Sequence, residues 1–196
     1  MTVVAETADA TESDAEVIGR AVRQPEAFAA LFDRHYRRIF AYAARRLGAG
    51  IAEDVAAETF LIAFDRRDRY DLGRADAGPW LYGIAANLIA RHDRAEARHL
   101  RALARSGEAV AIEFDADAVA GRLDATAVRG RLAEALAALP AAEREVLLLV
   151  AWAGLNGPDV AVALDIPAGT ARSRLHRART QMRAALMIED DTETEQ

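Results

Sequence analysis

The amino-acid sequence predicts an all-α fold with two small helical domains joined by a flexible linker, the C-terminal domain being a helix-turn-helix. Alanine is the commonest of the 196 residues and only 5 are proline, a composition that favours helices. Apolar residues recur three or four positions apart, and the alternation typical of strands never persists. Residues 106–130 contain three glycines, scattered acidic residues and few apolar ones, which indicates a linker between two helical blocks.

Charge is distributed unevenly along the chain. The net charge is -6, from 31 acidic residues and 25 basic residues, all of them arginine. Residues 1–24, 106–130 and 188–196 are acidic, whereas residues 25–105 and 131–187 are each net positive. Because a polyanion meets local charge and not the mean, both basic blocks are candidates for nucleic-acid binding. The first and last segments are expected to be tails, the first of them disordered, and a role confined to solubility is the alternative.

The sequence offers no site for enzymatic chemistry. It has no cysteine, and its four histidines form no zinc-binding spacing, so no metal site is predicted. Neither a GxxxxGK[ST] loop nor a GxGxxG motif occurs, so no nucleotide cofactor is expected. The longest apolar run, residues 146–153, is far shorter than the roughly 20 residues that span a bilayer. With no basic leader at the N-terminus, we predict a cytoplasmic protein that is not an enzyme, binds no cofactor and does not insert into membranes.

Residues 25–105 are expected to form three or four helices, three of which can be delimited. The first begins at Pro25, a residue suited to a first helical turn, and ends before Gly48. The second covers about 51–67, where apolar residues keep the helical period. A loop rich in Gly and Asp then leads to the third helix, which is predicted to run without interruption from 79 to 105.

The third predicted helix carries a series of polar groups on one face. One amide and five guanidinium groups recur at steps of three and four residues, which places them on the same side of a helix. Repeated cations destabilise a bare helix slightly and a polyanion would neutralise them, so the series favours nucleic acid over an ordinary solvated face. Aromatic residues near the start of this helix, Tyr70, Trp80 and Tyr82, could stack on unpaired bases or simply fill the core. The polar series consists of Asn87, Arg91, Arg94, Arg98, Arg101 and Arg105.

Residues 131–187 predict a helix-turn-helix. A helix is predicted over 131–139, and a second begins at Pro140 and ends before Gly154. The second is followed by a short helix capped by Asn156, a turn at Asp165 and a last helix capped by Thr170. A short helix, a tight turn and a helix with a basic outer face form the geometry that sets a recognition helix in the DNA major groove. The outer face of the last helix is predicted to carry Arg172, Ser173, Arg174, His176 and Arg177, followed by Arg179 and Arg183.

Four sequence motifs occur in a distinctive order. They are AEDVAAETFLIAF at 52–64, PWLYGIAANLIARH at 79–92, LPAAEREVLLLVAWAGL at 139–155 and IPAGTARSRLHRAR at 166–179. Together they resemble the bacterial RNA polymerase sigma factors of the extracytoplasmic-function (ECF) group, over residues 25–187. The resemblance implies a transcription initiation subunit that binds core RNA polymerase, directs it to promoters by reading -10 and -35 elements, and helps to melt DNA. It places a region 2 domain at 25–105 and a region 4 domain at 131–187.

The resemblance also implies roles for individual residues. Asp54, Glu58 and Phe60 match the helix that docks on core polymerase, and the loop 71–77 matches the loop that holds a flipped base of the -10 element. An anti-sigma factor is a further expected partner, beside core polymerase and promoter DNA. For the -10 region the implied DNA-binding residues are Trp80, Asn87, Arg91, Arg94 and Arg98. For the -35 region they are Arg172, Ser173, Arg174, His176 and Arg177.

The chain departs from the family's usual pattern at several positions. Ala57 stands where a Gln is usual, which weakens one expected polymerase contact. Gly83 replaces a common Arg, which removes one possible phosphate contact. Gly157 and Pro158 replace the usual aromatic and acidic start of the penultimate helix. Asp165 replaces a turn Gly, and Asp tolerates a left-handed conformation better than most residues. Two alternatives stay open at this point: a stand-alone helix-turn-helix transcriptional regulator, which leaves the first block unexplained, and a helical adaptor protein.

Overall fold

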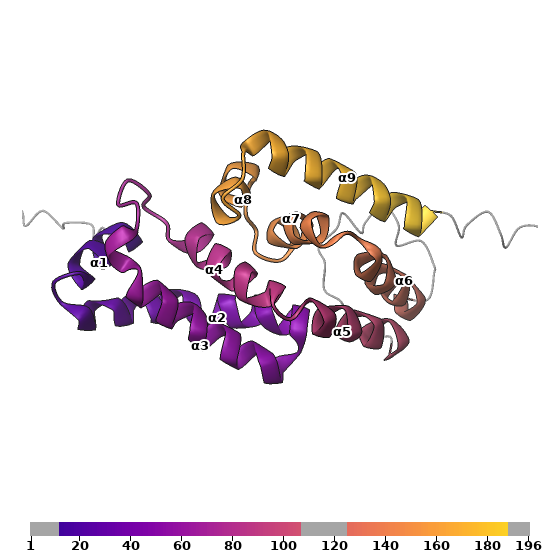
Figure 1. Ribbon diagram of the computed structural model, residues 1–196. Coiled ribbons are helices and arrows are strands. Elements are labelled where there is room, and N and C mark those ends of the chain that lie inside the picture. The colour runs from indigo at the N-terminus through magenta and orange to yellow at the C-terminus, as the bar shows by residue number, and fades with distance from the viewer. Residues whose placement is uncertain (1–11, 107–124, 188–196) are drawn as a thin grey trace, which may run out of the picture.

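The structure of the chain is a computed structural model that describes residues 12–106 and 125–187, and every regular element within those ranges is a helix (Figure 1). The all-α prediction is therefore confirmed. None of the described helices is both long and apolar enough to span a membrane. The elements are α1 (Asp14–Ala21), η1 (Pro25–Phe28), α2 (Ala29–Leu47), α3 (Ala49–Asp65), η2 (Arg67–Arg69), α4 (Gly78–Ala90), α5 (Asp93–Ser106), α6 (Ala125–Ala138), α7 (Ala141–Ala151), α8 (Gly157–Ala163) and α9 (Ala168–Met187).

The N-terminal unit packs α2, α3 and α4 around a shared apolar core. Leu31 and Ile39 of α2, Val55 of α3 and Leu81 of α4 are all buried there. Gly48 joins α2 to α3 with a φ of 83°, in the left-handed region that glycine tolerates and most residues do not. The predicted end of the first helix is therefore confirmed, although a short 3-10 turn, η1, precedes it.

A helix occupies part of the segment that we expected to be a disordered tail. Residues 1–11 lie outside the described residues, but α1 forms at Asp14–Ala21, so the prediction is wrong from residue 12 onwards. Ser13 and Glu16 start α1 with a capping box, in which each side chain bonds the other's backbone N–H. Val17 and Ile18 are fully buried and fix α1 to the N-terminal unit.

The third predicted helix is in fact two helices. α4 ends at Ala90 and α5 begins at Asp93, with a tight turn in which the N–H of His92 bonds the carbonyl of Ile89. The six polar groups consequently do not share one helical face. The turn lets Glu96, which the sequence places off the polar stripe, point into the interior, where it is buried against Arg46.

The C-terminal unit is built from α6, α7, α8 and α9. α6 begins at Ala125 instead of residue 131, so the predicted linker is shorter than expected, and its residues 107–124 lie outside the described residues. Asn156 caps α8 by accepting a bond from the N–H of Asp159 at 2.9 Å, as predicted. Asp165 has a φ of 50°, so the predicted left-handed turn is also confirmed.

The cap predicted at Thr170 is wrong, because α9 already begins at Ala168. The predicted acidic tail at 188–196 lies outside the described residues.

Candidate nucleic-acid interface

The outer face of α9 is an exposed polar surface of the C-terminal unit. Ala171, Ala178 and Met182 turn inward and are buried, and most polar side chains between them are exposed. α8, the turn at Asp165 and α9 together have the order of a helix-turn-helix, with α9 in the position of the recognition helix. The exposed residues of this face are Arg172, Ser173, His176, Arg177, Arg179 and Arg183.

Two of the predicted -35 residues are less free than the sequence suggested. Arg174 is half-buried. Arg177 uses its Nε to bond Glu143 of α7 at 2.7 Å, and Gln181 donates to the other oxygen of the same carboxylate at 3.0 Å. Glu143 is only 8 % exposed, so it ties α9 to α7 and orients Arg177. Sequence reasoning could not find this role of Glu143, because it depends on a contact between α7 and α9.

The predicted -10 residues are distributed over α4, the turn after it and α5. Asn87 is the exposed polar residue of α4, whose other faces are mostly buried. Arg91 lies in the turn and pairs with Glu58 of α3 at 3.4 Å, both side chains being exposed. Arg94 and Arg98 are exposed on α5, where Arg101 and Arg105 continue the basic face.

The aromatic residues near α4 belong mainly to the core. Tyr70 and Tyr82 are buried, which settles that neither can stack on a base in this arrangement. Trp80 is half-buried, with its ring 4.9 Å from that of Tyr70. Burial, followed by the charges of Asp14 and Asp76, raises the pKa of Tyr70 to about 12. Its hydroxyl therefore stays a donor, and it bonds the backbone carbonyls of the following loop.

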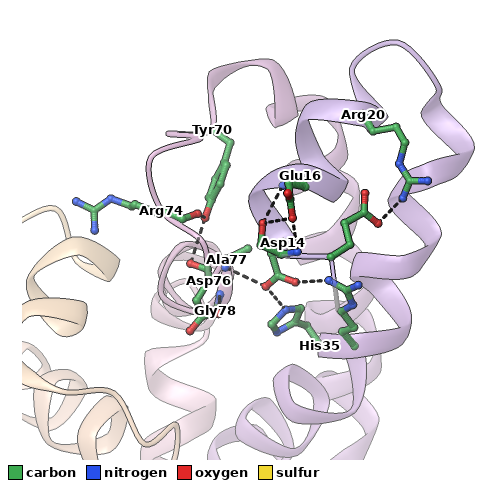
Figure 2. A network of polar contacts seen from close by, with 12 residues as sticks. Asp14, Glu16, Arg20, His35, Tyr70, Arg74, Asp76, Ala77 and Gly78 are labelled. Atoms are coloured by element: carbon green, nitrogen blue, oxygen red, sulfur yellow. Dashed lines mark hydrogen bonds and ion pairs between the residues drawn. The ribbon is translucent and has the colours of Figure 1, made fainter. Parts of the chain in front are cut away.

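The loop between η2 and α4 presents its side chains outward. All residues from 71 to 76 are exposed, although the loop backbone is hydrogen-bonded (Figure 2). The hydroxyl of Tyr70 donates to the carbonyls of Arg74 at 2.7 Å and Asp76 at 3.1 Å. The carboxylate of Asp71 accepts from the N–H of Gly73 at 3.0 Å. A fixed backbone with exposed side chains is an arrangement suited to selecting a ligand.

The predicted polymerase-binding residues of α3 divide between two faces. Asp54 and Glu58 are exposed four residues apart, on one side of the helix. Leu61 continues that side and is 69 % exposed, an apolar residue that the sequence reasoning missed. Phe60 instead lies in the core, 5 % exposed, with its ring 5.0 Å from that of Phe32. Direct contact between Phe60 and a partner is therefore unsupported, and its role in this structure is to hold α3 in place.

Both halves of the chain match families of known function. Residues 31–99 match the family described as Sigma-70 region 2, and residues 129–182 match the family described as Sigma-70, region 4. The ECF RNA polymerase sigma factor SigL of Mycobacterium tuberculosis is 31% identical over 173 residues, which cover 88% of this chain and 96% of SigL. The chain belongs to the ECF family of RNA polymerase sigma factors. Its members are transcription initiation factors and not enzymes, and they direct RNA polymerase to promoters.

Solved structures support the same fold for this sigma factor. CnrH, in complex with the cytosolic domain of CnrY, superimposes with a TM-score of 0.62 at 24% identity, covering 90% of this chain and 98% of CnrH. The sigma factor RpoE of Bartonella quintana, in complex with the anti-sigma factor NepR, gives a TM-score of 0.56 at 23% identity, covering 84% of this chain and 99% of RpoE. The prediction of two small helical domains is thereby confirmed.

In this sigma factor the region 4 unit packs directly on region 2. Figure 1 shows α8 beside α4, and the two helices approach so closely that a Cβ added to Gly83 would lie 2.2 Å from the carbonyl oxygen of Ala163. The resemblance described above implies an Arg at the position of Gly83. The lack of a side chain at Gly83 is therefore what allows α8 to cover α4.

A buried polar network joins the two units beside this contact. Arg46 of α2 is 2 % exposed and bonds Glu96 of α5 through Nε at 2.6 Å and Glu145 of α7 through Nη1 at 2.7 Å. The hydroxyl of Tyr42 donates to the same Glu145 oxygen at 2.8 Å. Arg144 of α7 pairs with Glu96 at 3.2 Å. Burial alone would lower the pKa of Arg46, but the neighbouring groups outweigh it and raise the pKa, so Arg46 remains charged between the two carboxylates.

Proposed function

We propose that this sigma factor binds core RNA polymerase through the exposed face of α3, and reads a -10 element with α4 and the loop 71–77. In the same proposal the N-terminal half of α9 reads a -35 element, and the region around Asn87 assists melting. The observation that carries the proposal is the outward, basic face of α9 behind a capped α8 and a left-handed turn. In this proposal, promoter binding and initiation take place in the cytoplasm, where promoter DNA and RNA polymerase are located.

The close packing of α8 on α4 implies that the two units separate when the protein contacts the -10 element. α4 exposes little besides Asn87 while α8 covers it, and a helix that contacts the -10 element needs more free surface. Separation exposes the buried network around Arg46, and water then solvates the charged groups of this network. An anti-sigma factor is a fitting partner for such a protein, since the similar RpoE has been seen with the anti-sigma factor NepR.

The proposal is tested by sequencing the 5′ ends of transcripts after forced expression of the protein in a bacterial host. New start sites that share two sequence elements at a fixed spacing are expected. A stand-alone regulator would change the use of existing start sites without creating a new shared pair of elements, and that result would contradict the proposal.

Replacing Asp54 and Glu58 of α3 by Ala is expected to lower the affinity for core polymerase by roughly tenfold, because charged groups at an interface are lost. Folding should be nearly unchanged, since the Glu58–Arg91 pair is exposed and such pairs contribute about 0–1 kcal/mol. A pull-down with purified core polymerase measures the effect. Glu53→Ala, on the neighbouring face of α3, is the matched control and should bind normally. Undiminished binding by the double variant would contradict the assignment of this face.

Replacing Arg172 by Ala should weaken initiation at promoters with an intact -35 element more than at promoters without it. Arg172 is exposed in the first turns of α9, where a guanidinium can bond a guanine edge, a contact worth about 1–3 kcal/mol of discrimination. Arg183→Ala, about three turns farther along, should weaken all promoters alike and reduce the salt slope by about one unit. Transcription from matched and scrambled templates at two salt concentrations separates the two effects. Equal losses on both templates would remove Arg172 from base reading.

A further inference from the structure

Helix α1 holds the loop 71–77 by its backbone. The N–H of Asp14 donates to the carbonyl of Ala75 at 3.0 Å. The N–H of Ala77 donates to Asp14 Oδ2, also at 3.0 Å (Figure 2). One residue of α1 therefore bonds both a donor and an acceptor near the end of the loop. Farther along, a Cβ on Gly19 would lie 3.6 Å from both terminal methyl groups of Leu72, so α1 also supports the start of the loop.

Asp14 is itself fixed from α2. Its side chain is nearly buried and receives Arg34 Nη1 on Oδ1 at 3.0 Å, while His35 Nε2 lies 2.6 Å from Oδ2. Burial alone would raise the pKa of Asp14, but the N–H of Ala77, followed by Arg34 and His35, outweighs it and lowers the pKa below its ordinary value. The carboxylate is therefore ionised at neutral pH and has three partners on two other segments of the chain.

The surroundings of Asp14 favour this hydrogen-bonded role over a metal site. Ligand atoms of Asp14, His35 and Asp76 lie within 4.8 Å of one another, a grouping that could hold a cation. The guanidinium of Arg34 already brings a positive charge to Asp14, and Asp76 Oδ1 accepts from the N–H of Gly78 at 2.8 Å. A cation here would have to displace these partners and would be repelled by Arg34.

The loop is consequently held on two sides while its side chains remain exposed. Tyr70 bonds the carbonyls of residues 74 and 76, and Asp14 bonds the backbone at 75 and 77. These bonds leave the backbone of the loop little freedom to change shape, whereas the side chains of residues 71–76 are exposed to a ligand. The shape that a flipped base would meet is thus determined partly by a residue of α1, far from the loop in sequence.

We propose that Asp14 is a positioning residue for -10 recognition, which fixes the shape of the loop 71–77 and thereby the preference among bases. This inference rests on the proposed function of the loop. Asp14 acts through the loop backbone and touches no base itself. Loss of Asp14 should accordingly reduce discrimination between bases and not only the amount of transcript.

The experiment measures initiation by the full-length protein with core polymerase on four templates that differ in one -10 base. The position tested is the one at which variants of the loop, Leu72→Ala with Arg74→Ala, change the preference. Asp14→Ala is expected to reduce the ratio between the best and the worst base by about two- to tenfold, the range expected for one lost hydrogen bond. Arg20→Ala is the matched control, because Arg20 lies on α1 but bonds Glu12 on the surface. It should leave the ratio unchanged.

A second variant covers the case in which Asp14→Ala detaches α1. Gly19→Leu favours the helical state of α1 but occupies the space of Leu72, so it should also reduce the ratio, whereas Gly19→Ala makes an ordinary contact and should not. If Asp14→Ala and Gly19→Leu lower transcription from all four templates equally, Asp14 has only a structural role and the inference is overturned. If the loop variant itself leaves the preference unchanged at every -10 position, the proposed function of the loop fails, and the inference with it.

Discussion

Gly83→Ala is expected to shift the free protein from the closed arrangement to one in which α8 and α4 are apart. The added Cβ would lie 2.2 Å from the carbonyl oxygen of Ala163, far inside van der Waals contact. Overpacking of this kind costs about 1–3 kcal/mol, which corresponds to a change of roughly five- to 140-fold in the equilibrium between the closed and the open arrangement. Region 2 itself should not suffer, since Ala is favoured over Gly in a helix interior by about 1 kcal/mol.

The separation can be measured by spin labels on cysteines introduced at Ala90 of α4 and Ala184 of α9. Both positions are exposed, and the chain has no cysteine of its own. A longer and broader distance distribution is expected for Gly83→Ala than for the parent. Gly50→Ala is the matched control, because a Cβ there meets nothing within 4 Å. Identical distributions for Gly83→Ala and the parent would show that the α4–α8 contact does not hold the units together.

Arg46→Met is expected to lower the free energy of unfolding of the closed protein by about 3–5 kcal/mol, the range found when one partner of a buried ion pair is removed. Without the guanidinium, Glu96 and Glu145 both lose their bond to Arg46, and Arg144 and Tyr42 remain as their respective partners. Opening of the two units relieves part of this penalty, because water can then solvate both groups. Urea unfolding gives the free energy, and the spin-label distances show how much of the response is opening.

The matched control for Arg46→Met is Arg37→Met, which places the same substitution at an exposed position of α2. It should change the free energy of unfolding by no more than about 0.5 kcal/mol. Combining Arg46→Met with Glu145→Gln should be less destabilising than the sum of the single changes, since the second change removes the unpaired charge left by the first. Strict additivity would argue against direct coupling of these two residues.

Local signals predicted much of the fold. The end of α2 at Gly48, the cap of α8 at Asn156 and the left-handed turn at Asp165 each depend on a few neighbouring residues, and all three are confirmed. α1 carried an equally local signal in Ser13 and Glu16, three residues apart before an apolar pair. The acidic composition of residues 1–24 favoured a disordered tail, but the capping box and the buried pair Val17 and Ile18 outweigh it in the folded chain.

The features that the sequence did not predict depend on contacts between distant segments. The break between α4 and α5 accompanies the burial of Glu96 against Arg46, 50 residues away. The burial of Phe60 depends on Phe32, and the tie between Arg177 and Glu143 depends on the packing of α9 on α7. The sequence alone marks Gly83 as a departure from the family pattern. The close approach of α8 to α4, which explains the glycine, appears only in the folded chain.

Run-off transcription with purified core polymerase tests the account most directly. The template carries the two promoter elements found from transcript 5′ ends, and matched templates have either element scrambled. We expect a transcript of defined length only when core polymerase and this protein are both present, with strong losses when either element is scrambled. If the protein instead bound the intact template alone with the same sequence preference and gave no transcript with core polymerase, it would act as a stand-alone regulator and the account would be contradicted.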